Sequence, residues 1–599
     1  MTKTNLGEFK TLLPYLARYR FRYALGFLFL VAVDAAQVVI PQFMRRAVDI
    51  ISSGAFELED VIVPAAAMAA LMAFISLGRF LWRFFINGSA RRIETEMREK
   101  LFDHLLSLSY DFYQKNKIGD LMSRSSSDIN AVRESIGMGL VALVDGTVMA
   151  AAILIIIFVQ DFKTAAFAVL PLPLITVLIL LFGGAVGKRF RRAQETYSGL
   201  SNVVQETFAG VRVLKSFVKE WWFIKKFDGA NDDYRDANME LVKLFGFFFP
   251  FISFLSGLTV IMVLLAGGIR VAEGLMSPGD LVALFRYLQM LIWPIMGAGF
   301  VVNMIQRGAA ALGRVNEVMN TRPGIRSPLK ASRPDEGAEE LVGIRNLSFA
   351  YPEGREALED INLSIKRGTL VGILGPTGSG KSTLIKAMTR MIDPPPGTVF
   401  VKGIEAALWD LRELRKVFAL TPQDSFLFSD SIRNNVLYGA GAAGAEGETL
   451  DKAVRLSALD RDLESFPLGL DTLIGERGLT LSGGQKQRTA VARSAASGRE
   501  ILILDDSLSA VDGETEKRIL AGLREERRQR KLRGVPLTMI VISHRVSALS
   551  RADRIVVLEK GRISEEGTPR ELLLKGGLYA RTAALQKLGD PSAGEGSGG

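Results

Sequence analysis

A glycine-rich segment that ends in a lysine and two hydroxyl residues spans positions 375–383. Its sequence, GPTGSGKST, fits the pattern G-x-x-x-x-G-K-[ST] and follows the apolar run LVGIL. Glycines let backbone N–H groups turn toward phosphate oxygens, the lysine adds positive charge, and a serine hydroxyl is a ligand for Mg²⁺. The segment predicts an ATP site between a strand and a helix, formed by Gly375, Pro376, Thr377, Gly378, Ser379, Gly380, Lys381, Ser382 and Thr383.

Two adjacent acids, Asp505 and Asp506, end the β-branched run ILILDD of residues 501–506. A carboxylate at the end of a buried strand is a common ligand for Mg²⁺, so we expect Asp505 to hold the metal together with Ser382. A general base for the attacking water belongs at the next position, which Asp506 occupies. The second acid is therefore a candidate catalytic residue.

A second glycine-rich segment, LSGGQ, lies between these two motifs and leads into the helical stretch QKQRTAVARSAA. Backbone N–H groups at a helix N-terminus bind anions, and a serine with two glycines leaves them accessible. A five-residue match is weak alone, but its place between the other motifs makes it specific. We expect a second phosphate cradle made by Leu481, Ser482, Gly483, Gly484 and Gln485.

The composition excludes several other chemistries. The 599 residues include no cysteine and only two histidines, which excludes disulfide frameworks, thiolate zinc sites, cysteine nucleophiles and multi-histidine metal sites. The formal net charge of +10 could indicate nucleic acid binding. The basic residues gather instead in loops between apolar segments, which is typical of the cytoplasmic side of membrane proteins. We therefore expect no nucleic acid partner.

Six apolar segments are long enough to cross a bilayer, and they lie near residues 23–43, 61–85, 137–160, 163–186, 244–268 and 280–305. The long loops 89–136 and 187–243 are rich in Lys and Arg, which predicts that both loops and both termini are cytoplasmic in a protein of the cell (inner) membrane. Both loops show helical apolar spacing. We expect the membrane helices to continue into them, and separate cytoplasmic hairpins are the alternative.

The rest of the chain divides by composition. Residues 1–20 are amphipathic and predict a helix at the membrane surface, ahead of a membrane domain over residues 21–320. Residues 321–340 are polar and contain prolines, as in a linker. From 341 to 585, β-branched runs alternate with helical stretches, which predicts a soluble α/β domain. The small polar tail 586–599 is expected to be disordered.

From about residue 10 to 585, the order and spacing of these motifs resemble an ABC half-transporter of the exporter type. The resemblance implies a membrane all-α six-helix domain with long cytoplasmic helical extensions, followed by a P-loop α/β nucleotide-binding domain. In such proteins two nucleotide domains pair head to tail, and each ATP lies between the P-loop of one and the LSGGQ of the other. The expected cofactors are ATP and Mg²⁺, and the expected partners are a second half-transporter, membrane lipids and a small amphipathic substrate.

The resemblance also implies roles for four residues that carry little signal alone. Tyr351 matches the aromatic that stacks on adenine, and Gln423 matches the glutamine that reaches Mg²⁺ and the attacking water. His544 matches the switch histidine that bonds the γ-phosphate, and Asp512 matches the acid of the loop that contacts the opposite site. Without this frame, an aromatic or a histidine after an apolar strand is more often a packed core residue.

The chain departs from the family at Asp506, where most members have glutamate. The aspartate is one methylene shorter, so its carboxylate retreats by roughly 1 Å, and a misplacement of that order can cost about 10²-fold in rate. A harmless exchange of acids is one reading, and a site that binds ATP and hydrolyses it slowly is the other. With its intact LSGGQ, the chain resembles the degenerate-site subunit of bacterial heterodimeric multidrug exporters, which predicts a heterodimer; a homodimer is the alternative.

Polar residues inside apolar segments are candidates for lining a substrate path, and hydrogen bonds between packed helices are the alternative account. They are Asp34, Gln37, Asp145, Arg286, Gln289 and Asn303. We expect export of hydrophobic or amphipathic compounds such as drugs or lipids. A lipid flippase and an ATP-binding channel or regulator that does not pump are the alternatives.

Overall fold

The structure of the chain, a computed structural model, describes residues 6–54, 57–351, 354, 356–440, 447–475 and 481–588. The chain forms two compact units, each described here by itself. The membrane unit contains residues 1–107 and 116–321, and the nucleotide unit contains residues 322–599 together with the short segment 108–115.

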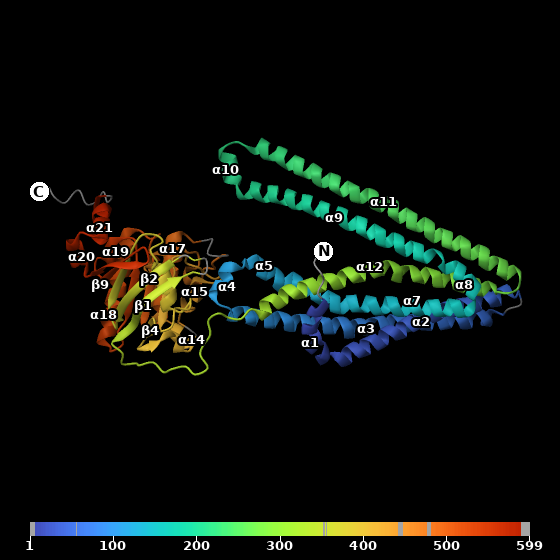
Figure 1. Cartoon of the computed structure of the whole chain (residues 1–599), viewed down its shortest axis with the longest axis horizontal. Coiled ribbons are helices and arrows are strands. Elements are labelled where there is room, and N and C mark those ends of the chain that lie inside the picture. The colour runs from blue at the N-terminus through green and yellow to red at the C-terminus, as the bar shows by residue number, and fades with distance from the viewer. Residues whose placement is uncertain are drawn as a thin grey trace. The chain divides into compact units, whose positions relative to one another are not determined.

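The membrane unit is helical throughout its described residues. Its helices are η1 (Leu6–Leu12), α1 (Leu13–Arg18), α2 (Arg20–Ser52), α3 (Leu58–Ser107), α5 (Ile118–Ser123), η2 (Arg124–Asp128), α6 (Ile129–Glu134), η3 (Ser135–Gly139), α7 (Leu140–Gln160), α8 (Phe162–Val169), α9 (Pro171–Ala209), α10 (Val211–Ser216), α11 (Glu220–Ala272) and α12 (Pro278–Asn320). Figure 1 shows α9 and α11 as a long pair joined through α10.

The expected continuation of the membrane helices is confirmed, because α3 and α11 run without a break from apolar into charged sequence. Residues Ile118–Gln160 likewise form one helix of 43 residues, through the π-helical turns η2 and η3. Five helices among the described residues are long and apolar enough to cross a membrane. The predicted segment 163–186 lies in α8 and α9, and several of its side chains are outside the described residues.

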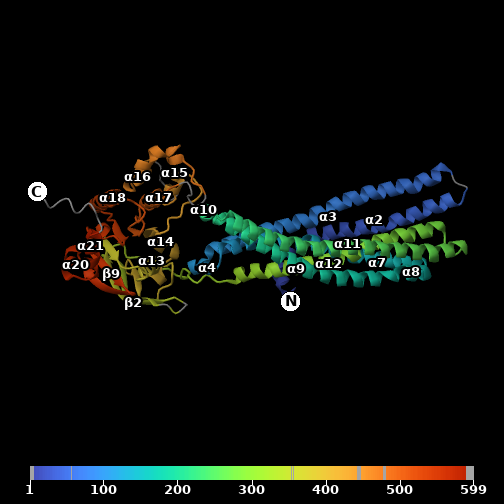
Figure 2. The ribbon, with the colours of Figure 1, turned by 90° about the horizontal axis from the view of Figure 1, so that it is seen from above.

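Glycines let the helices of the membrane unit approach closely. A Cβ on Gly78 of α3 would lie 2.4 Å from the side chain of Val33 of α2. Over most of their length, α2 and α3 run side by side (Figure 2). The buried Tyr287 of α12 donates a hydrogen bond over 2.8 Å to the carbonyl of Val38. These contacts hold α2 between α3 and α12.

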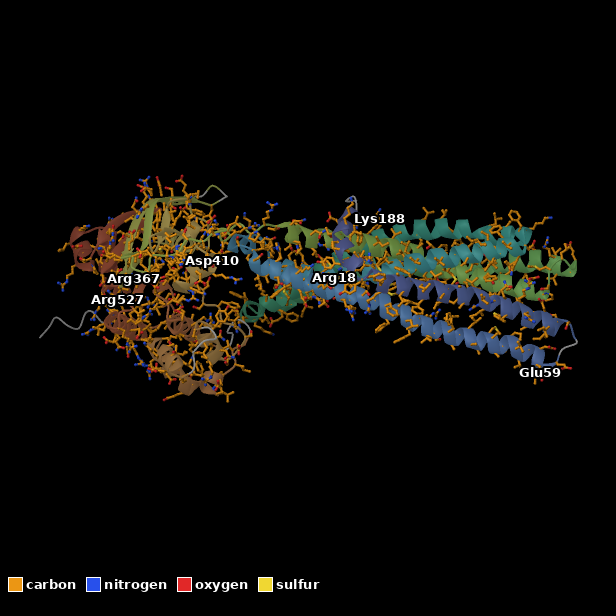
Figure 3. The ribbon with its side chains drawn as sticks, turned by 90° about the horizontal axis from the view of Figure 1, so that it is seen from below. Arg18, Glu59, Lys188, Arg367, Asp410 and Arg527 are labelled. Atoms are coloured by element: carbon orange, nitrogen blue, oxygen red, sulfur yellow. The ribbon has the colours of Figure 1, made fainter. Side chains whose placement is uncertain are left out.

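The N-terminal segment, predicted as a helix over residues 1–20, is helical from Leu6 to Arg18, where the 3-10 helix η1 runs directly into α1. The η1 helix packs on α12, where Asn316 donates a hydrogen bond to the Glu8 carboxylate over 2.7 Å. Arg18 at the end of α1 forms an ion pair of 2.9 Å with Glu96 of α3. Figure 3 shows Arg18 part of the way along α3, with Glu59 at the far end of that helix. The segment is thus fixed to the long helices.

The nucleotide unit contains two sheets and the helices around them (Figure 1). Its strands are β1 (Glu340–Ala350), β2 (Glu356–Lys366), β3 (Leu370–Leu374), β4 (Val399–Val401), β5 (Ile404–Glu405), β6 (Phe418–Thr421), β7 (Ile501–Asp505), β8 (Thr538–Ile542), β9 (Arg554–Glu559) and β10 (Arg562–Gly567). Its helices are α4 (Tyr110–Lys115), α13 (Lys381–Met388), η4 (Ala406–Leu408), α14 (Leu411–Lys416), α15 (Ile432–Leu437), α16 (Glu448–Leu456), η5 (Leu459–Ser465), η6 (Gly469–Asp471), α17 (Gly483–Ala496), α18 (Gly513–Leu532), α19 (Val546–Leu549), α20 (Pro569–Lys575) and α21 (Leu578–Leu588).

The larger sheet has the strand order β10-β9-β3-β8-β7-β6, and its strands are parallel except for β10. Strands β3 and β8 are buried along their whole length, which explains why their sequences are continuous apolar runs. Because parallel strands end at one edge of a sheet, the segments after β3, β7 and β8 meet there. The three segments carry the glycine-rich motif, Asp505–Asp506 and His544.

The segments at the two ends of the nucleotide unit are more ordered than the predicted linker and disordered tail. The polar segment 321–340 is fastened to the domain, because Glu336 forms an ion pair of 2.7 Å with the buried Lys402 and Ser332 donates its N–H to the Leu408 carbonyl over 2.9 Å. Helix α21 extends to Leu588, so the chain is helical beyond residue 585, where the disordered tail was expected to begin. Residues 589–599 lie outside the described part of the chain.

Candidate functional site

A pocket of about 390 Å³ lies at the carboxyl edge of the larger sheet. Residues from five separate segments of the sequence line it, which the sheet topology brings to one place. They are Tyr351, Glu356, Ala357, Thr377, Gly378, Gly380, Lys381, Ser382, Thr383, Gln423, Asp505, Asp506 and His544. The pocket therefore contains most of the residues that the sequence predicts for ATP, Mg²⁺ and catalysis.

The glycine-rich loop between β3 and α13 has a backbone that only glycines adopt without strain. Gly378 and Gly380 have φ angles of 81° and 103°. A Cβ on Gly380 would also lie 2.5 Å from the carbonyl oxygen of Ala357, and one on Gly375 would lie 2.3 Å from that of Leu558. The loop thus follows the surface of the sheet closely at the start of α13, where backbone N–H groups face an incoming anion.

Lys381 is the first residue of α13, and its ammonium group folds back over the loop. Its Nζ donates hydrogen bonds of 2.8 Å to the carbonyls of Gly375 and Pro376. Burial lowers the pKa of this ammonium, and the nearby charges of Asp505 and Asp506 oppose that shift. A buried cation beside two carboxylates is suited to bind phosphate oxygens, which would take over from the loop carbonyls.

Ser382 and Asp505 face each other across the pocket, since the Ser382 hydroxyl donates to Oδ2 of Asp505 over 3.3 Å. Burial raises the pKa of the Asp505 carboxyl above its usual value, and the bond from Ser382 opposes this shift. A hydroxyl, a carboxylate and the amide oxygen of Gln423 make a hard oxygen donor set of the kind that Mg²⁺ prefers. These residues therefore fit the expected metal.

Asp506 has a left-handed backbone with a φ of 45°, and its N–H donates to the Ile542 carbonyl of β8 over 3.0 Å. Aspartate adopts this conformation more readily than most residues that carry a Cβ. The backbone thus fixes the base position beside the pocket, and the length of the side chain decides how far the carboxylate extends into it.

Tyr351, Gln423 and His544 reach the pocket from three different loops. The Tyr351 hydroxyl lies 3.3 Å from Oγ1 of Thr383, and its ring stands edge-on to Phe349 at 5.3 Å. Gln423 is exposed after β6, and His544 is half-buried after β8. Each residue lies where its expected role requires it, although their contacts with a nucleotide stay predictions.

The signature segment and Asp512 lie outside the pocket. Ser482 caps α17 by accepting the N–H of Gln485 over 3.2 Å, and the Gln485 side chain accepts the N–H of Ser482 over 3.0 Å. The Asp512 carboxylate caps α18 by accepting the N–H of Thr515 over 2.9 Å, and this bond lowers the pKa of Asp512. Since neither group lines the pocket of its own chain, both are available to another site.

The loop of residues 509–512 is held by two residues that sequence reasoning missed. Gln487 of α17 accepts the N–H of Ala510 over 2.9 Å and donates to the Ser509 hydroxyl over 3.1 Å. Arg545, directly after His544, donates to the carbonyls of Ser509 and Val511 over 3.1 Å each. Helix α17, the loop 509–512 and the loop that carries His544 are thus linked by hydrogen bonds. In the sequence, only the short motifs SHR and GGQKQ point to Arg545 and Gln487.

A third residue outside the prediction, Gln586 of α21, holds the loop that carries His544. Its amide donates to the His544 carbonyl over 2.6 Å, and its oxygen accepts the N–H of Val546 over 2.8 Å. No motif marks Gln586, which lies in the stretch that the sequence assigned to a disordered tail. The C-terminal helix therefore takes part in positioning the switch loop.

The six polar residues predicted in the membrane unit separate into two groups. Asp34 and Gln37 of α2 lie near Asp145 of α7, and Arg79 of α3, which the sequence prediction omitted, donates to Gln37 over 3.0 Å. Arg286, Gln289 and Asn303 are exposed on α12, where Arg286 donates to Gln289 over 3.2 Å. The first group combines three helices, whereas the second stays on one.

Comparison with known proteins matches both units. Residues 23–295 match the ABC transporter transmembrane region, and residues 358–509 match the ABC transporter domain. The chain is 35% identical to the "Probable multidrug resistance ABC transporter ATP-binding/permease protein YheI" of Bacillus subtilis, over 95% of this chain and 96% of that protein. It is 32% identical to an "ATP-dependent lipid A-core flippase" of Syntrophus aciditrophicus, over 83% and 81%.

The fold agrees with this result. The solved structure of a bacterial Atm1-family ABC exporter with ATP bound superposes with a TM-score of 0.75 at 25% identity, and the match covers 95% of this chain and 99% of that one. A helical membrane region and a P-loop α/β domain occur in the same order in both. The chain therefore belongs to the ABC transporter family, as an exporter-type protein with one membrane domain and one nucleotide-binding domain.

Proposed function

We propose that this chain is one half of an ATP-driven exporter of hydrophobic or amphipathic compounds, such as drugs or lipids, in the cytoplasmic membrane. The observation that carries the proposal is the pocket that joins the glycine-rich loop, Asp505, Gln423 and His544, in a chain that also has a unit of helices long enough to cross a membrane. Relatives that are named for multidrug resistance and for lipid A-core flipping support the substrate class. Both termini are expected in the cytoplasm, where ATP is available.

The geometry of the pocket supports the nucleotide-binding roles that we propose. Lys381 and the backbone of the glycine-rich loop hold the phosphates, and Ser382, Gln423 and Asp505 hold Mg²⁺. Tyr351 covers the adenine, and His544 bonds the γ-phosphate. Bound MgATP supplies the free energy for export when its terminal phosphate is cleaved.

We propose further that the chain works in an asymmetric heterodimer, in which its own ATP site hydrolyses slowly. The support is Asp506, whose backbone is fixed by the Ile542 carbonyl and whose carboxylate lies one methylene short of a glutamate. The intact signature at Ser482–Gln485 caps α17 and would complete the site of the partner subunit. The partner would then carry the catalytic glutamate, and this chain would supply its second phosphate cradle.

A lipid flippase that acts as a homodimer is the second candidate, and the relatives named for lipid A-core flipping favour it. The two candidates differ in what the chain does alone. A homodimer would hydrolyse ATP and move lipid without another subunit, whereas the heterodimer needs a second half-transporter that carries the catalytic glutamate.

Transport in inside-out membrane vesicles tests the proposal. Vesicles that contain this chain and its partner half-transporter should accumulate a fluorescent amphipathic dye when MgATP is added. Lys381→Ala in this chain should reduce the accumulation, because the ammonium group that holds the phosphates is lost. Absence of ATP-driven accumulation of any amphipathic probe by the wild-type pair would contradict export and favour an ATP-binding channel or regulator.

A further inference from the structure

A buried carboxyl group in the membrane unit has no donor among the described residues. Asp34, near the middle of α2, is 1% exposed, and neither of its carboxylate oxygens accepts a hydrogen bond from a described N–H or O–H group. An ionised carboxylate in such a place is costly unless a positive group compensates it. The buried aspartate therefore needs a proton or a cation, and no described N–H group or hydroxyl stands in for one.

The charged groups around Asp34 come from two neighbouring helices. The carboxyl group of Asp145, on α7, and the guanidinium of Arg79, on α3, lie near enough to act on Asp34 electrostatically. Arg79 nevertheless donates its hydrogen bond to Gln37 over 3.0 Å. On the third neighbour, α12, the guanidinium of Arg286 is bonded to Gln289. Asp34 and Asp145 thus form a pair of acids without a bonded cation.

Ionising two neighbouring carboxyl groups, one of them buried, is costly with nothing between them, because their like charges repel and burial removes the water that would stabilise them. One shared proton satisfies the pair, and so does one cation. The two acids differ in access, since Asp34 is buried whereas Asp145 is half-buried and next to Gly146. A cation would reach Asp145 first, and the shared proton would leave as the cation takes its place.

We propose that Asp34 and Asp145 form a cation-binding site that selects positively charged amphipathic substrates, and that each bound cation replaces the proton shared by the two carboxyls. This inference rests on the proposed function, whose substrate class it narrows. The charge balance is one positive charge in and one proton out. Apolar side chains of the surrounding helices would contact the rest of the substrate, and the acids would recognise its charge.

Tetraphenylphosphonium is a suitable probe, because it is permanently charged and has no proton to lose. Triphenylphosphine oxide is a neutral compound of similar shape. Binding of each to the full-length chain with its partner half-transporter is measured in lipid nanodiscs by equilibrium dialysis. Proton release is followed with a pH indicator in weakly buffered solution, and we expect about one proton for each phosphonium bound and none for the oxide.

Asp34→Asn and Asp145→Asn remove one charge each with little change in volume. We expect each to weaken phosphonium binding by about 30-fold or more and to abolish proton release, while the affinity for the oxide changes far less. Asp103→Asn is the matched control, because Asp103 is exposed on the charged part of α3. It should bind phosphonium and release protons as the wild type does.

Either of two results would overturn the inference: no phosphonium binding with proton release in the wild type, or phosphonium binding by Asp34→Asn that equals the wild type. The wild-type measurement does not depend on how well a variant folds. ATP-driven uptake of triphenylphosphine oxide by wild-type vesicles reports on export separately. Its presence without proton release would refute the acid pair alone, whereas its absence together with proton release would refute the proposed function alone.

Discussion

The Ser382 hydroxyl donates a hydrogen bond to the Asp505 carboxylate over 3.3 Å, although 123 positions separate the two residues in the sequence. Parallel pairing of β3 and β7 with β8 between them accounts for this contact, because it brings the helix after β3 and the end of β7 to one edge. Both oxygens are hard donors that would help to hold Mg²⁺. At Asp505 the metal and a proton would compete for the same carboxylate.

Mg²⁺ binding to this site should weaken on mild acidification. The pKa of Asp505 is raised by burial, so in the metal-free site this carboxyl takes up a proton at a higher pH than an exposed aspartate does. Because Mg²⁺ needs the ionised form, Mg²⁺-dependent ATP affinity should fall as the pH falls from neutral through the raised pKa of Asp505. Titration calorimetry with and without EDTA at each pH separates this effect from ATP binding itself.

Asp505→Asn provides the comparison for this prediction, since it cannot titrate. The Mg²⁺-dependent affinity of this variant for ATP should be low at every pH of the series. A wild-type affinity that stays constant over this range, or an equally steep pH dependence in Asp505→Asn, would show that another group titrates.

Replacing Gln586 by Ala should slow ATP turnover without a matching loss of ATP binding. The substitution removes the two hydrogen bonds that hold the backbone of His544 and Val546. Since the loop stays in place less often, we expect kcat to fall several-fold while the KM for ATP changes little. Steady-state ATPase assays of the complex with the partner half-transporter measure both constants.

Gln586→Glu tests whether the two hydrogen bonds or the bulk of the side chain matter. The glutamate can still accept the Val546 N–H, but it cannot donate to the His544 carbonyl, so an intermediate kcat is expected. Gln529→Ala, on the exposed part of α18, is the matched control. Equal kcat values for wild type and Gln586→Ala would rule out a positioning role for α21.

Asp512→Ala should lower the thermal stability of the nucleotide-binding domain by a few degrees, because α18 loses its N-terminal cap. The pKa of Asp512 is lowered in the folded state, so its charge stabilises the fold at neutral pH and this contribution disappears as the pH falls through the lowered pKa. Differential scanning calorimetry of the full-length protein, at neutral pH and at a pH below the lowered pKa of Asp512, measures the effect.

Asp512→Asn retains an oxygen that can cap the helix, and its Tm should lie close to that of the wild type at neutral pH. If both variants unfold at the wild-type temperature, the cap contributes nothing, and Asp512 would serve only a neighbouring ATP site.

The sequence predicted the parts of the protein that follow from local pattern. The apolar runs predicted the long helices, and the spacing of the glycines before Lys381 predicted the loop at the end of β3. The alternation of apolar strands and helices sufficed for the α/β domain, because a parallel sheet buried on both faces needs continuous apolar runs such as LVGIL.

Long-range partners could not be predicted, because they depend on packing rather than pattern. The local sequence RFLW does not indicate that Arg79 lies near Asp34. The local sequence ALQKL does not indicate that Gln586 forms hydrogen bonds with the loop that carries His544. The linker was predicted to be unattached because its polar residues resemble solvent-exposed ones. In the structure, Glu336 of the linker forms an ion pair with Lys402, which directly follows β4.

ATP turnover by the full-length chain, alone and with its partner half-transporter, tests the proposed asymmetry most directly. The chain alone should bind MgATP and hydrolyse it slowly, and the partner should raise turnover by about 10²-fold, the penalty of a base that lies about 1 Å short. In the pair, Asp506→Asn should change the rate little, whereas glutamine in place of the partner's catalytic glutamate should nearly abolish it. Rapid hydrolysis by the chain alone that Asp506→Asn abolishes would contradict the account.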